Sequence, residues 1–179
     1  MTSPARILSD RSGAVLLEIA LVLPLVLLLV LGVADIGRFI VIVQKIERTS
    51  VSLADLVGRE AALSSETQDG VFAAARHILT PFELGTNGTV LVSVLRGQGS
   101  GTARIEWQGQ SGAVGTSALG VSGTTIPIPA GLAMAEHDAL IVAEVVYRHR
   151  FLFLPDLVAG EPIRKVGYAR PRAADFKAG

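Results

Sequence analysis

The most prominent pattern in the chain is an apolar run near its start. Residues 14–34 contain a single charged side chain, Glu18, among 21 positions. A helix rises about 1.5 Å per residue, so this run spans about 31 Å, enough to cross a hydrocarbon core of about 30 Å. A removed secretory signal fits less well, because its apolar region is usually about 7–15 residues long. We therefore predict a retained transmembrane helix over residues 14–35, with a kink caused by Pro24.

A helical pattern continues beyond the apolar run. Asp35 and Arg38 mark the membrane exit and stand within reach of each other on one helical face. After them, spacings of three and four alternate along a stripe with one polar member: Ile36, Phe39, Val43, Ile46, Ser50, Leu53 and Val57. This predicts a helical stalk over residues 36–60. Two interpretations stay open: the stripe covers the core of its own domain, or it bundles with similar helices.

The remaining residues, 61–179, predict a small domain that mixes helices and strands. A helical period over residues 71–79 ends at Pro81. Strand patterns occupy residues 89–95, 103–107, 139–147, 151–154 and 162–168. We expect the first two to pair as a hairpin, and the uncharged residues 107–135 to form a long loop packed on the sheet or on a partner. The predicted fold class is α+β, with a long N-terminal helix followed by a small antiparallel sheet with short helices.

Composition and charge narrow the possible functions. Hydrophobic residues make up 50% of the 179 residues, which suits one membrane segment plus one modest domain. The net charge is zero, so no global field attracts nucleic acid. The lack of cysteine excludes disulfides, thiolate metal sites and a lipidated cysteine anchor. Basic residues flank both ends of the apolar run, but the short N-terminal tail favours an exported C-terminal domain.

Glu18 is the position in the run that needs a chemical reason. A carboxylate near the bilayer centre costs about 2.5–3.5 kcal/mol, and such groups are functional by default. A cut between Gly13 and Ala14 would supply a partner, because the new α-ammonium lies one helical turn from Glu18 and is mostly charged at neutral pH. The same ammonium could reach Glu18 of a neighbouring copy. The plainer alternative is an interfacial acid whose side chain extends to water.

A set of positions around the start of the run resembles the class III signal of type IV pilins and pseudopilins: Arg11, Gly13, Glu18 and Pro24. In that group a prepilin peptidase cuts after the glycine, and the glutamate guides assembly. The resemblance implies that Gly13 and Ala14 flank the cut. It also implies that Arg11 and Glu18 are recognised by the peptidase and that Glu18 directs assembly.

The membrane-exit sequence at residues 31–38 resembles that of TadE-like pilus assembly proteins, the minor pseudopilins of tight-adherence (Tad) pili. Ile19 departs from the pattern, since a phenylalanine often follows the glutamate. Weaker resemblances to the TadE/TadG group lie at residues 54–57, 81–82, 105–107, 126–127, 141–147 and 170–172. The length favours a TadE-type protein, because TadG members usually carry a much larger domain.

The resemblance implies a pilus assembly protein with no enzymatic activity and no cofactor. The implied partners are the prepilin peptidase, other Tad minor pilins, platform proteins and the major pilin. The implied location is the bacterial inner membrane, with residues 1–13 as a cytoplasmic leader peptide and residues 61–179 as a periplasmic domain; incorporation into the pilus stays open. The alternative is an uncleaved single-pass scaffold protein of the same secretion machine.

Other chemistry has weaker support in the sequence. The three histidines, His77, His137 and His149, share no metal-ligand spacing. The glycines at 97, 99 and 101 follow a predicted strand but lead into another strand, so no helix N-terminus is there to hold a phosphate. A membrane-tethered hydrolase would need a convergent catalytic cluster, which the sequence does not show. The basic residues near the C-terminal end predict a solvated face or, alternatively, contact with acidic lipid or partner surfaces.

Overall fold

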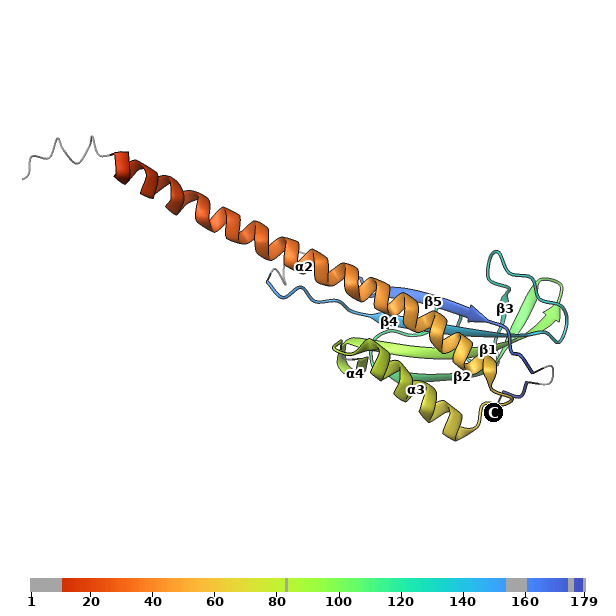
Figure 1. Cartoon of the computed structure of the whole chain (residues 1–179). Coiled ribbons are helices and arrows are strands. Elements are labelled where there is room, and N and C mark those ends of the chain that lie inside the picture. Colours follow the sequence, from red (N-terminus) through yellow and green to blue (C-terminus); the bar gives the residue numbers. More distant parts are fainter. Residues whose placement is uncertain (1–10, 83, 154–160, 174–175, 179) are drawn as a thin grey trace, which may run out of the picture. The chain divides into compact units, whose positions relative to one another are not determined.

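The computed structural model describes residues 11–82, 84–153, 161–173 and 176–178 (Figure 1). These residues fall into two compact units. The first contains residues 11–39 and 151–153, and the second contains residues 40–150 and the described residues from 161 onward. The predicted α+β class is confirmed, because a long N-terminal helix precedes an antiparallel sheet with short helices.

Helix α2 (Arg11–Arg59) runs through both predicted helical segments without a break (Figure 1). Pro24 lies inside it and has no N–H, so the carbonyl of Ala20 lacks its intrahelical donor. Every residue from 13 to 31 is exposed, and the mean hydropathy reaches 3.0. Among the described residues this is the one helix long and apolar enough to cross a membrane, which indicates a single-pass membrane protein.

In the second unit, the later part of α2 packs on the sheet. Five of its apolar side chains are fully buried: Ile42, Ile46, Leu53, Ala54 and Val57. Their spacing places them on one helical face. The later members of the predicted stripe, Ile46, Ser50, Leu53 and Val57, are buried and cover the core of their own domain, the first of the two interpretations. Ile36, at the start of the stripe, is exposed instead. This unit begins at Ile40, whereas the sequence suggested a separate stalk over 36–60. The hydrophobic period is the same for both arrangements and does not separate them.

The sheet has five antiparallel strands in the order β3-β2-β1-β4-β5. Their bounds are Gly88–Gly99 for β1, Thr102–Gly112 for β2, Thr125–Pro127 for β3, Ala139–Tyr147 for β4 and Ile163–Ala169 for β5. The predicted hairpin is confirmed as β1 and β2. Residues 151–153 form no strand, so that prediction is wrong for them, and residue 154 lies outside the described residues.

Helices cover one face of the sheet. Besides α2, these are α3 (Ser65–Leu79) and the short α4 (Leu84–Asn87), which leads directly into β1 (Figure 1). The hydroxyl oxygen of Ser64 accepts the N–H of Thr67 and caps α3. From β4, alternate side chains join the helix-facing core: Ile141, Ala143, Val145 and Tyr147.

The uncharged loop between β2 and β4 covers the opposite face. Its apolar side chains pack beside residues of β1, β2 and β4: Val114, Leu119, Ile126, Ile128, Leu132 and Met134. Backbone hydrogen bonds join it to β2, with the amide of Ile105 donating to Thr124 and the amide of Gly123 donating to Ile105. Of the two predicted locations for this loop, the structure shows the sheet. The predicted bounds 107–135 are too wide, because residues 107–112 belong to β2 and residues 125–127 form β3.

Helix α2 approaches β5 closely at Gly167. A Cβ there would collide with the carbonyl oxygen of Ser50 and lie 2.6 Å from the amide nitrogen of Val51. The hydroxyl of Ser50 donates to the carbonyl of Glu47 at 2.8 Å, which satisfies it inside the helix. The polar member of the predicted stripe is therefore small and internally bonded where two backbones meet.

Asp55 connects the end of α2 to the C-terminal segment. It accepts a 3.0 Å hydrogen bond from Nε of Arg59, and this hydrogen bond is the main cause that lowers the pKa of Asp55. A second guanidinium, that of Arg172, lies 3.4 Å away, and the amide of Arg172 donates to the carbonyl of Gly58. Two separated sequence segments that resemble the TadE/TadG group, 54–57 and 170–172, are thus in contact.

Candidate processing and assembly site

The predicted processing and assembly residues lie on the exposed part of α2. Arg11 is its first residue, Gly13 and Ala14 belong to the first turn, and Glu18 follows one turn later. Ala14 and Glu18 are exposed, and a Cβ added at Gly13 meets no atom within 4 Å. The bond between Gly13 and Ala14 is therefore accessible in this structure.

Glu18 shares one face of α2 with apolar residues. Together with Ile19, Val22, Leu23 and Val26, it lines a shallow hollow on the helix surface. Residues four apart lie on the same helical face, so this face extends back to position 14. We call it the Glu18 face. A second helix that packs on it contacts the acid and the apolar residues together.

Asp35 directly follows the apolar run. It makes a contact that the sequence did not indicate. Its side chain is 2% exposed, and its two carboxylate oxygens accept the backbone N–H groups of Leu152 and Phe153 at 3.0 and 2.9 Å. One helical turn later, the ring of Phe39 stacks on that of Phe151 at 6.0 Å with an interplanar angle of 19°. The contact joins residues 117 positions apart, so no local pattern predicts it.

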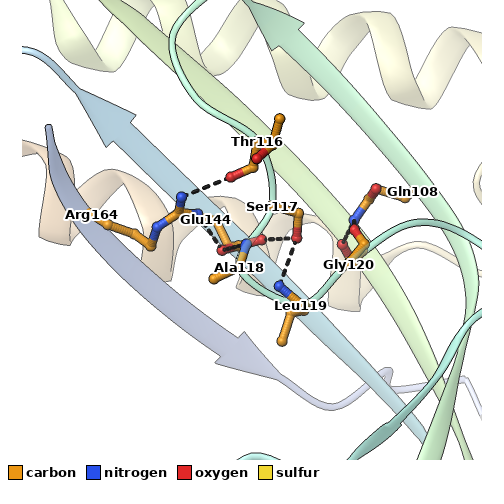
Figure 2. A network of polar contacts seen from close by, with 9 residues as sticks. Gln108, Thr116, Ser117, Ala118, Leu119, Gly120, Glu144 and Arg164 are labelled. Carbon is orange, nitrogen blue, oxygen red and sulfur yellow. Dashed lines mark hydrogen bonds and ion pairs between the residues drawn. The ribbon is translucent and has the colours of Figure 1, made fainter.

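A second polar cluster surrounds Glu144 in β4 (Figure 2). Glu144 is 1% exposed, and its Oε1 accepts from Nη1 of Arg164 at 2.7 Å and from the amide of Ala118 at 3.0 Å. Its Oε2 accepts from the hydroxyl of Ser117, and Arg164 also donates to the carbonyl of Thr116 at 2.7 Å. Both carboxylate oxygens are engaged by the loop and β5. These hydrogen bonds hold the loop against β4 and β5 and so stabilise its position on the sheet.

Replacing Ser117 by alanine should loosen this loop. The hydroxyl donates to Glu144 and accepts from the amide of Leu119 at 3.1 Å, so its loss leaves a buried carboxylate oxygen without its donor. We expect a cost of about 1–3 kcal/mol, seen as faster amide hydrogen exchange over residues 113–124. Ser122→Ala is the matched control in the same loop, because the Ser122 hydroxyl is exposed and makes only a 3.4 Å contact. Equal exchange in the two variants would contradict the assignment.

Several charged groups of the described residues are paired with each other. No group of three or more His, Asp or Glu residues among them is arranged to hold a metal ion. A shallow polar pocket on β1 and β2 contains Arg96 and Glu106, but these form an ion pair at 2.9 Å. Arg96 also donates to the carbonyl of Phe176 at 2.9 Å. These contacts of Arg96 join β1 to β2 and to the C-terminal segment.

Across the described residues, the one exposed apolar helix and the sheet indicate a single-pass membrane protein with an α+β domain. Residues 13–50 match the family described as TadE-like protein, which supports membership of that family and confirms the predicted resemblance over this segment. The match begins at the glycine of the predicted cut and includes the apolar run, the exit sequence and the first buried turns of the second unit. No curated protein and no solved structure matches the chain.

Proposed function

We propose that the protein is a minor pseudopilin that assists assembly of a Tad-type type IV pilus. The match of residues 13–50 to the TadE-like family carries this proposal. The exposed apolar helix supports it, because no residue from 13 to 31 is buried within the chain itself. Such a surface needs lipid or other helices around it. The protein therefore acts by packing and recognition.

In the proposed mechanism, a prepilin peptidase cuts between Gly13 and Ala14 and removes residues 1–13. The new ammonium of Ala14 and the carboxylate of Glu18 then lie one turn apart on the Glu18 face. In the low dielectric of the membrane, the ammonium of one copy attracts Glu18 of a neighbouring helix strongly. A pair of this kind fixes the register of two helices that otherwise slide freely. Pro24 adds a point where the helix can bend during packing.

The proposed location is the bacterial inner membrane, with a short cytoplasmic N-terminus and the α+β domain in the periplasm. Other Tad minor pilins, platform proteins and the major pilin are the proposed partners of the helix and the domain. The second candidate function is an uncleaved membrane scaffold of the same machine. The isoleucine at position 19, where the pilin-like pattern often has phenylalanine, is the observation that favours it.

Replacing Gly13 by leucine should block processing without disturbing the fold. A Cβ at this position meets no atom within 4 Å, and leucine favours a helix more than glycine does. A bulky side chain does, however, keep a peptidase from approaching the backbone closely. We expect the wild-type protein, extracted from bacterial membranes, to lack residues 1–13 by intact-mass measurement, and Gly13→Leu to retain them.

Gly37→Leu provides the matched control for this experiment. Gly37 lies in the same helix, and its Cβ position is equally open. The control protein should be processed like the wild type, which separates peptidase recognition from a general effect of a larger side chain. If the wild-type protein itself keeps residues 1–13, the scaffold function replaces the pseudopilin.

A further inference from the structure

The three residues Phe151, Leu152 and Phe153 form a short loop, here called the exit loop, that is held against α2 within the first unit (Figure 1). The carboxylate of Asp35 accepts hydrogen bonds from the backbone N–H groups of Leu152 and Phe153. Phe39, four residues further along the helix, stacks on Phe151. Residues four apart lie on one helical face, so the loop is fixed at two successive points of the same face.

This attachment leaves two large apolar side chains exposed. Leu152 is 56% exposed and Phe153 is 50% exposed, although the backbone beside them is bound by a buried carboxylate. An exposed leucine alone needs no explanation, but adjacent apolar side chains on a fixed backbone form a small apolar surface. The backbone N–H groups of the loop thus bind Asp35, while its apolar side chains at positions 152 and 153 are exposed.

The position of the exit loop along α2, beside Asp35, indicates what contacts its exposed side chains. Asp35 is the first residue after the apolar run of about 31 Å, so it lies where a spanning helix leaves the hydrocarbon core. The exposed apolar surface of residues 14–34 reaches this level, Ile36 just beyond it is 57% exposed, and the exit loop belongs to the same unit as this part of α2. Aromatic and leucine side chains bind well in this interfacial layer, where their apolar parts leave water while backbone groups remain satisfied.

We propose that the exit loop is a second membrane anchor, in which Leu152 and Phe153 insert into the headgroup and acyl-chain boundary beside α2. The occupant of this surface is lipid, because the loop is continuous with the lipid-facing surface of the helix. Asp35 is the positioning residue, since its carboxylate holds the loop backbone at the membrane exit. The loop fixes the depth and rotation of α2, which a smooth apolar helix alone does not fix.

The charges next to the loop in sequence agree with this location. Arg148 and Arg150 directly precede the exit loop, and both are exposed. Basic side chains at the membrane surface are attracted by anionic headgroups while apolar neighbours insert. Vesicles that contain anionic lipid should therefore bind the loop more firmly than purely zwitterionic vesicles.

The protein contains no cysteine, so a single introduced thiol can report the surroundings of the loop. Leu152→Cys and, separately, Phe153→Cys are labelled with an environment-sensitive fluorophore in the full chain, purified and placed in lipid vesicles. Quenchers carried by lipids near the headgroup should quench both labels, and aqueous iodide should quench them several-fold less than a reference label. Val121→Cys is the reference, because Val121 is an apolar side chain with 65% exposure in the loop between β2 and β3.

The outcomes separate lipid from other occupants. Iodide quenching equal to that at position 121 means that the loop lies in water, which overturns the proposal. Protection from iodide without quenching by lipid means that a second copy covers the loop, and this also overturns it. In the Asp35→Ala background, the label at position 152 should lose most of its protection. An unchanged label there would remove the positioning role of Asp35. None of these readouts depends on pilus assembly or on processing.

Discussion

Replacing Glu18 by alanine should abolish pilus assembly while membrane insertion continues. Insertion becomes easier, because the change removes a carboxylate from an apolar helix at a saving of up to about 3 kcal/mol. In the proposed mechanism assembly fails, because the ammonium of a neighbouring helix then enters the membrane without its partner. Losing one member of a buried ion pair costs about 3–5 kcal/mol, which corresponds to at least about a hundredfold loss in association. Surface pili are counted by electron microscopy, and the variant protein is measured in the membrane fraction.

Two neighbouring substitutions make the Glu18 experiment specific. Leu17→Ala removes more apolar surface at an adjacent exposed position, where the wild-type side chain is 74% exposed, and should leave piliation close to normal. Glu18→Asp keeps the charge on a shorter side chain and should restore part of the assembly. Normal piliation by a stable, inserted Glu18→Ala protein would remove the assembly role of this residue, even if processing at Gly13 is confirmed.

Replacing Gly167 by valine should strongly destabilise the sheet domain. The added side chain points into the backbone of α2 at Ser50 and Val51, which cannot move as a flexible side chain can. Gly167 is not among the residues with a positive φ, so the close contact, and not backbone strain, is the reason for glycine here. Overpacking of this kind costs about 3 kcal/mol. For a domain of this size we expect a fall of roughly 10 °C in the melting temperature.

The intrinsic fluorescence of Trp107 is a direct readout for this domain. It is the single tryptophan of the chain, and it packs against the helix-facing core. Gly70→Ala is the matched control, because Gly70 lies inside α3 and its Cβ position is open. That change should stabilise the protein by about 0.5–1 kcal/mol, the opposite sign. If the Gly167→Val protein had the same melting temperature as the wild type, α2 would not pack on β5 as described.

Local sequence patterns predicted the elements that are uniformly buried or uniformly exposed along their length. The predicted strand over 139–147 coincides with β4, because eight of its nine residues are buried and the run is bounded by polar positions. The apolar run and the acid within it could also be recognised from the sequence, because residues 14–34 alone define both features. The first turns of α3, residues 65–70, were missed because their polar residues and Gly70 resemble a loop, although Ser64 is a favourable N-cap residue.

The features that the sequence did not reveal depend on distant partners. The alternation of aromatic and leucine residues at 151–153 is typical of a strand, yet hydrogen bonds to Asp35 hold this segment against a helix. The three residues of β3 are too few to form a pattern, and they include Pro127. Glu144 gave the one available signal, as a charged residue within a buried strand, which requires a partner. Register pairing places Arg164 opposite Val146, diagonally next to that acid.

The ends of the sheet limit how copies of this protein can join. One outer strand, β3, has three residues and ends in a proline, and the other, β5, carries Arg164 and Lys165 in sequence. Short, proline-containing or charged outer strands resist addition of a foreign strand. When many copies crowd into one membrane, this discourages amyloid-like stacking of their folded domains. Under the proposed function, the joining of copies is then left to contacts between their helices.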